Sequence, residues 1–202
     1  MIKAIITDCM GVVVSSPKQK MLMELSVQYD KDLEDLNVVW KKLMEEVYKN
    51  PNMTEEELFE QFIMNANLQG MSPNELRKMM DLFMVANKEM LQWLKEKKKN
   101  YVLFMASNNW KERAEYLRKK YSLDSLFEDY FWGFTSGVTK SSQEYFDILK
   151  ESLAKKGIHP EDAVMIDNKK EYLERAKKAG FQTILFETVA KLEQDFQKIT
   201  GV

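Results

Sequence analysis

The predicted fold is built around the first fourteen residues, Met1-Ile-Lys-Ala-Ile-Ile-Thr-Asp-Cys-Met-Gly-Val-Val-Val14. Its apolar run at 2–6 is short and rich in isoleucine, which is typical of a strand covered on both faces in a parallel sheet. Asp8 follows the strand, and Gly11 lies where the chain can turn sharply. Because ligands of open α/β sheets bind beyond the carboxyl ends of strands, Asp8 is a candidate site residue. Alternatively, it only caps the next turn.

The rest of the chain alternates between strand and helix patterns. The predicted strands cover residues 101–106, 130–135, 163–166 and 182–186. The predicted helices cover 86–99, 110–121, 142–156, 170–179 and the tail from 189. Strands that alternate with helices favour a parallel sheet with right-handed crossovers. We therefore expect an α/β protein with a parallel-sheet, Rossmann-like core of three layers.

Residues 15–85 interrupt this alternation and have a wholly helical pattern. Apolar side chains recur at helical spacing there, for example at Leu36, Trp40, Leu43 and Val47. Capping signatures open two further helices, at Thr54 with Glu57 and at Ser72 with Glu75. We predict two domains, an α/β core of residues 1–14 plus 86–202 and a four-helix insertion of residues 15–85.

Composition narrows the classes of function. The chain has 202 residues, of which 45% are hydrophobic and 31% charged, and its net charge is −2. It has no basic excess for nucleic acid and no apolar run long enough to cross a bilayer. Its single cysteine excludes an internal disulfide, and its single histidine, His159, excludes a histidine-rich metal cluster. With a strand at the N-terminus we expect no signal peptide and a cytoplasmic location. The oligomeric state stays open.

Polar residues end three of the predicted strands at one edge of the sheet. They are Asp8, Ser107 and Asp167, and Lys140 follows the third strand. Two neighbouring carboxylates repel each other unless a cation lies between them, and oxygen ligands of this kind suit Mg²⁺. Ser107 and Lys140 would hold phosphoryl oxygens, and a carboxylate such as Asp8 can attack phosphorus directly.

Four motifs then carry a resemblance over nearly the whole chain. They are Ile5-Ile-Thr-Asp8-Cys-Met10-Gly11-Val, Met105-Ala-Ser107-Asn108, Lys140, and Val164-Met-Ile-Asp167-Asn168. In this order they resemble the motifs of the haloacid dehalogenase-like superfamily, most of whose members are phosphatases. The helical insertion after the first strand resembles the helical cap of that superfamily.

The resemblance implies a role for each candidate residue. Asp8 would be the nucleophile, with Ser107 and Lys140 as the other catalytic residues. Asn108 would either contact the substrate beside these two or fix its own loop. The implied Mg²⁺ ligands are Asp8, Asp167 and the main-chain carbonyl of Met10. The implied partner is a small phosphorylated molecule.

The sequence departs from the family pattern at the position of Met10. Phosphatases of the superfamily carry a second aspartate there, which protonates the leaving oxygen and then helps to activate water. Methionine cannot transfer a proton. The fourth motif reads Asp167-Asn168 where a second acid is common, Ser141 replaces the usual proline after Lys140, and the preceding loop is a few residues shorter.

Three hypotheses fit these residues. The first is an Mg²⁺-dependent phosphohydrolase that forms an aspartyl-phosphate at Asp8 and is impaired or specialised by Met10. The second is a catalytically inactive relative that binds phosphate or has a regulatory role. The third is a dehalogenase or phosphonatase-type hydrolase, because halide release needs no acid on the leaving group.

Overall fold

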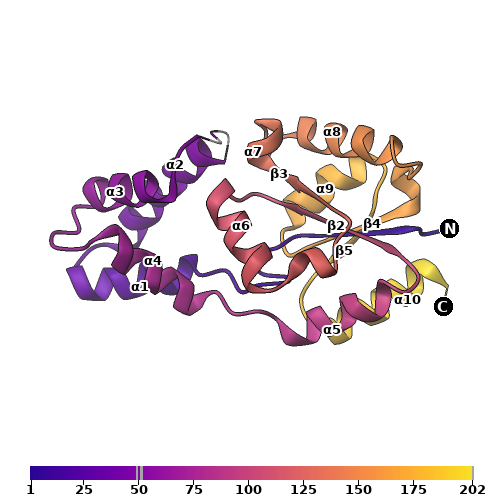
Figure 1. Ribbon diagram of the computed structural model, residues 1–202, viewed down its shortest axis with the longest axis horizontal. Helices are drawn as coiled ribbons and strands as arrows, with labels where there is room; N and C mark the ends of the chain where they lie inside the picture. The colour runs from indigo at the N-terminus through magenta and orange to yellow at the C-terminus, as the bar shows by residue number, and fades with distance from the viewer. Residues whose placement is uncertain (49, 51, 202) are drawn as a thin grey trace.

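The computed structural model describes residues 1–48, 50 and 52–201. Its centre is a five-stranded, wholly parallel sheet with strand order β3-β2-β1-β4-β5 (Figure 1). The strands are β1 (Ala4–Thr7), β2 (Val102–Ser107), β3 (Asp129–Trp132), β4 (Ala163–Asp167) and β5 (Gln182–Leu185). This arrangement confirms the predicted α/β class with a parallel sheet.

The first strand lies in the middle of the sheet and is completely buried. Ile5 is paired with Leu103 of β2 on one side and with Val164 of β4 on the other. In a parallel sheet in this register, the three strands end at the same edge. The residues that follow β1 and end β2 and β4 are therefore brought together.

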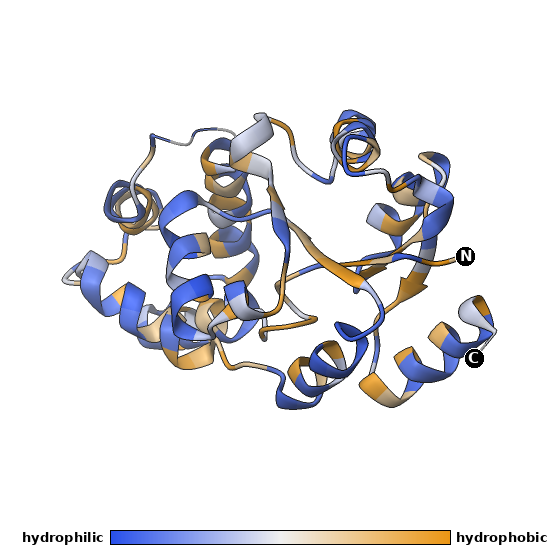
Figure 2. Cartoon of the chain, turned by 45° about the vertical axis from the view of Figure 1, so that its right-hand side comes forward, coloured by the Kyte–Doolittle hydropathy of each residue, from blue (hydrophilic) through white to orange (hydrophobic). Residues whose placement is uncertain are grey.

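Helices cover both faces of the sheet and make three layers. The helices α5 (Lys88–Lys97), α6 (Lys111–Lys120) and α10 (Val189–Thr200) contribute buried side chains to the same apolar cluster as Ile5. Ala4 and Ile6 point the other way and pack with α8 (Gln143–Ala154) and α9 (Lys170–Lys178). Figure 2 shows the apolar colour concentrated on the strands and on one side of the helices.

The inserted segment forms four helices beside the sheet (Figure 1, indigo to magenta). They are α1 (Lys18–Tyr29), α2 (Leu33–Val47), α3 (Glu55–Asn65) and α4 (Pro73–Phe83). Both predicted capping boxes are present, at the start of α3 and of α4. The two connections to the sheet run side by side, since the Ser15 N–H donates to the Val85 carbonyl at 2.8 Å and the Asn87 N–H donates to the Val13 carbonyl at 2.9 Å. We call these four helices the helical unit.

A buried ion cluster joins the helical unit to the core. Arg113 of α6 is 1% exposed, and its Nε donates to Oε1 of Glu55 in α3 at 2.7 Å. Its guanidinium also pairs with Asp81 of α4. Trp110 Nε1 donates to the same Glu55 oxygen at 3.0 Å, and Arg77 Nε donates to the other at 2.8 Å. Arg113 and Glu55 therefore pair across the boundary between the two parts almost wholly out of water, whereas Asp81 and Arg77 are partly exposed.

The predicted third strand at 130–135 is too long. β3 ends at Trp132, and Gly133–Ser136 forms the one-turn helix α7. The apolar run misleads because Phe134 stacks on the Trp132 ring at 6.2 Å instead of continuing the strand. Gly133 permits the turn, since a Cβ there would lie 3.1 Å from the Val138 carbonyl oxygen. The chain consequently reverses early, which compensates for the short loop before Lys140. Two short 3-10 turns, η1 (Leu123–Ser125) and η2 (Pro160–Asp162), complete the described elements.

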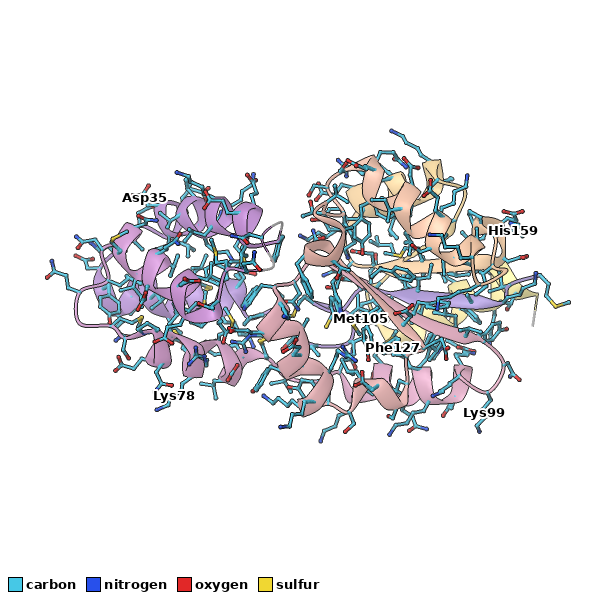
Figure 3. The ribbon with its side chains drawn as sticks, turned by 45° about the horizontal axis from the view of Figure 1, so that its top comes forward. Asp35, Lys78, Lys99, Met105, Phe127 and His159 are labelled. Atoms are coloured by element: carbon cyan, nitrogen blue, oxygen red, sulfur yellow. The ribbon has the colours of Figure 1, made fainter. Side chains whose placement is uncertain are left out.

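Two further observations concern His159 and membrane insertion. His159 is exposed at the end of the core that faces away from the helical unit (Figure 3), so it belongs to the surface. Asp35 and Lys78 mark the opposite end of the molecule in the same view. Within the described part of the chain, no helix combines the length and apolar character needed to span a bilayer.

Candidate active site

Asp8 and Asp167 lie side by side at the carboxyl edge of the sheet. The Asp8 N–H donates to the carbonyl of Ile166 at 2.8 Å, which extends the pairing of β1 with β4 by one residue. Asp167 ends β4, is completely buried, and its Oδ1 accepts the Lys169 N–H at 2.9 Å. Asp8 is 6% exposed. Two carboxylates thus converge in a mostly dry environment, where their mutual repulsion is strong.

Lys140 lies between the two carboxylates. Its Nζ donates to Asp8 Oδ1 and to Asp167 Oδ2, each at 2.6 Å, and the side chain is 1% exposed. Burial alone would lower the pKa of Lys140, but the two carboxylates outweigh burial and hold that pKa well above its usual value. Burial raises the pKa of Asp167, against the opposing attraction of Lys140. The lysine is therefore a fixed ammonium at neutral pH.

Asn108 holds the loop that carries this lysine. Its Oδ1 accepts the main-chain N–H of Lys140 at 3.0 Å. Two roles were predicted for Asn108, contact with the substrate and fixing of a loop, and this contact supports the second. The shortened loop and the serine at position 141 do not prevent Lys140 from reaching Asp8 and Asp167.

Ser107 supplies a hydroxyl without a hydrogen-bonding partner. It ends β2, is 1% exposed, and its Oγ has no partner among the described residues. The Nδ2 of Asn109, also buried, has none either within the same part of the chain. Buried polar atoms are normally paired, because an unpaired one costs about 1–3 kcal/mol. Two such donors beside Asp8 indicate a place for a ligand with several oxygen atoms.

These residues line one cavity of about 170 Å³. Asp8, Met10, Ser107, Asn109 and Lys140 are among its lining residues, whereas the completely buried Asp167 is not. Trp40 of α2, Tyr48 directly after α2 and Met80 of α4 line the side that the helical unit covers. The sheet therefore supplies the charged groups of the cavity and the helical unit supplies much of its apolar wall.

Gly11 gives the loop after Asp8 its shape. Its φ is +85°, in the region that favours glycine, and a Cβ there would lie 2.2 Å from Nδ2 of Asn168. The side chain that follows Asp167 thus packs directly onto the turn that follows Asp8. A larger residue at position 11 would have to displace it.

The donor set suits a hard divalent cation. Asp8, Asp167 and Lys140 together carry one excess negative charge, and all available ligand atoms are oxygens. Among the described residues, no group of three or more His, Cys, Asp or Glu side chains could hold a metal by itself. Mg²⁺ commonly takes only one or two carboxylates and completes its shell with water and substrate phosphate. Asp8 and Asp167, with the main-chain carbonyl of Met10, therefore fit Mg²⁺.

Two lysines on the cavity wall were not found by sequence reasoning. Lys18 is the first residue of α1, and Lys169 precedes α9. Lys169 follows the Asp167-Asn168 motif directly, so its position at a strand end was an available signal.

Comparison with known proteins identifies the family to which this architecture belongs. The model of the haloacid dehalogenase-like hydrolase family matches residues 29–186. A search of curated proteins by sequence finds no match. Among solved structures, a family enzyme from Bacteroides thetaiotaomicron, complexed with magnesium and inorganic phosphate, is 16% identical, with a TM-score of 0.74 over 95% of this chain and 99% of that one.

Two further solved structures show the same fold at low identity. A chain from Porphyromonas gingivalis, described as a predicted hydrolase of this family, is 18% identical, with a TM-score of 0.74 over 97% of this chain and 98% of that one. The L-2-haloacid dehalogenase of Xanthobacter autotrophicus, with chloropropionic acid covalently bound, is also 18% identical, with a TM-score of 0.66 over 94% of this chain and 80% of that one. The family model spans most of the chain, and this protein belongs to the haloacid dehalogenase-like hydrolase family.

Proposed function

We propose that this protein is an Mg²⁺-dependent phosphohydrolase that acts on small phosphorylated molecules through an aspartyl-phosphate at Asp8. The observation that carries the proposal is the contact of one buried ammonium, Lys140, with both Asp8 and Asp167, beside the unpartnered hydroxyl of Ser107. The complex of the Bacteroides thetaiotaomicron enzyme with magnesium and inorganic phosphate adds support.

Each residue has a defined task in this reaction. An oxygen of Asp8 attacks phosphorus while the bond from phosphorus to the leaving oxygen breaks, and the leaving oxygen keeps the electron pair. Ser107 and Lys140 donate to the other phosphoryl oxygens and offset their charge. Water then attacks the phosphorus of the aspartyl-phosphate while the bond from phosphorus to the Asp8 oxygen breaks, so Asp8 leaves as a carboxylate and the protons of the water stay with inorganic phosphate. Mg²⁺ bound by Asp8, Asp167 and the Met10 carbonyl would neutralise phosphoryl charge and orient the group.

Met10 determines which substrates suit this site. It lines the cavity where family phosphatases present a proton-donating acid, and its thioether has no proton to give. Leaving groups that depart without a proton, such as those of acyl and aryl phosphates, are therefore favoured. The second step lacks a base to activate water and should be slow.

The same residue supports a second candidate, a relative that binds phosphate without turnover. Both candidates share the cavity, and they differ in whether phosphate is released. A dehalogenase of the kind seen in Xanthobacter autotrophicus is the third, and it would release halide from a haloacid with no need for a metal.

Metal removal distinguishes these candidates. We expect phosphate release from acetyl phosphate and phenyl phosphate in Mg²⁺, its loss in EDTA, and its return when Mg²⁺ is added in excess. The measurement is the initial rate of phosphate release, with chloride release from 2-chloropropionate followed in parallel. Phosphate-binding without release from either compound would favour the second candidate. Chloride release that survives EDTA would overturn the proposal in favour of the third.

A further inference from the structure

Two lysines reach the catalytic cavity from opposite parts of the molecule. Lys18 comes from the helical unit and Lys169 from the core, and both line the cavity that contains Asp8. Both also line two adjoining cavities of about 490 and 530 Å³. They therefore lie where a ligand would extend from the phosphoryl position towards solvent.

Neither lysine has a carboxylate partner in the described part of the chain, where no Asp or Glu oxygen lies within 4.0 Å of either ammonium. Lys18 is partly buried, and its pKa is lowered by burial first and by the charge of Lys169 second. Glu34, in one adjoining cavity, offsets this only in part. Lys169 lies with its Nζ 5.0 Å from the Tyr172 ring centre. An ammonium whose pKa is lowered by burial and by a neighbouring cation would be stabilised by an anion bound beside it.

The net charge of the cavity indicates how much negative charge a bound substrate should carry. Asp8, Asp167 and Lys140 together carry one negative charge. Bound Mg²⁺ and a phosphoryl dianion cancel each other, so this charge is unchanged when they bind. Lys18 and Lys169 then bring the total to one positive charge. A single further anionic group on the substrate would make the loaded cavity neutral.

We propose that Lys18 and Lys169 form a subsite for a carboxylate, and that the substrate is a small phosphorylated carboxylic acid. The proposal rests on the proposed function for the place of the phosphoryl group. It adds the substrate class and the two residues that select it. The apolar wall of Trp40 and Tyr48 would contact the carbon skeleton between the two anionic groups.

A pair of phosphonates that cannot be hydrolysed as phosphate esters tests the subsite by binding alone. Phenylphosphonate and 4-carboxyphenylphosphonate differ only in the carboxylate, and calorimetric titration in Mg²⁺ measures both dissociation constants. We expect the carboxylated compound to bind about tenfold more tightly, as one charge-assisted hydrogen bond implies. Lys18→Met and Lys169→Met should each remove most of this preference while changing phenylphosphonate affinity much less.

The matched controls are Lys20→Met and Lys170→Met, which replace exposed lysines beside the two positions and should keep the preference. Wild-type protein that binds both compounds equally would overturn the subsite and leave the proposed function standing. An equal loss of both ligands in the two variants would mean that the lysines hold the phosphonate, which also overturns it. Failure of wild-type protein to bind phenylphosphonate would count against the proposed function as well.

Discussion

Replacing Met10 with aspartate is expected to accelerate hydrolysis of alkyl phosphates by about 10²–10⁴-fold. This corresponds to a barrier lower by roughly 3–5 kcal/mol. The reason is that an alkoxide leaves poorly without a proton, and Met10, on the cavity wall with Asp8, cannot provide one. Aspartate at this position would protonate the leaving oxygen and then draw a proton from the attacking water. The measurement is kcat for a phosphorylated alcohol in saturating Mg²⁺.

Met10→Asn is the matched control, because asparagine has the shape of aspartate but transfers no proton. It should leave the rate on alkyl phosphates near that of the wild-type protein. The gain from aspartate should also be much smaller for acetyl phosphate, whose leaving group departs without a proton. Equal rates for the two variants on every substrate would show that proton transfer at position 10 does not limit this site.

Replacing Arg113 with methionine is expected to lower the free energy of unfolding by about 3 kcal/mol, the low end of the 3–5 kcal/mol typical of a broken buried ion pair. Glu55 is only 6% exposed, so it cannot recover its lost partner from water. Arg77 and Trp110 still donate to Glu55, which limits the loss. Urea unfolding followed by circular dichroism measures the change.

Arg118→Met is the matched control on the same helix. Arg118 pairs with Asp124 at the surface, where the side chains are 38% and 60% exposed, so its loss should cost only about 0–1 kcal/mol. A cost for Arg113→Met no larger than that of the control would contradict a stabilising role for the ion cluster.

The sheet edge was predictable because parallel strands end together. Apolar runs placed Asp8, Ser107 and Asp167 at strand ends, and the structure brings all three to one edge of the sheet, where Asp8 and Ser107 line the cavity. Lys140 was harder to place, since its distance from the sheet depends on where β3 stops. The aromatic run beyond Trp132 concealed the turn at Gly133, and only the folded chain shows how the short loop reaches Asp8.

The contributions of the helical unit were not predictable in the same way. Helical periodicity separates buried from solvated faces within one helix, and it assigns charged residues such as Arg113 to solvent. Arg113 is buried because Glu55, 58 residues away, meets it across the boundary between the two parts. Lys18 reaches the cavity for a similar reason, since the position of the helical unit beside the sheet decides where its side chain lies. Such contacts have no signature in a single sequence.

Mass spectrometry of Asp8 after incubation with acetyl phosphate and Mg²⁺ tests the nucleophilic role most directly. The sample is quenched in acid within the steady state, digested, and compared with Asp8→Asn protein treated alike. Because nothing at position 10 activates water for the second step, we expect the peptide that contains Asp8 to gain the mass of one phosphoryl group, and the variant's peptide to gain none. An unmodified Asp8 peptide, with or without phosphate release, would contradict the assignment of Asp8 as a phosphoryl acceptor.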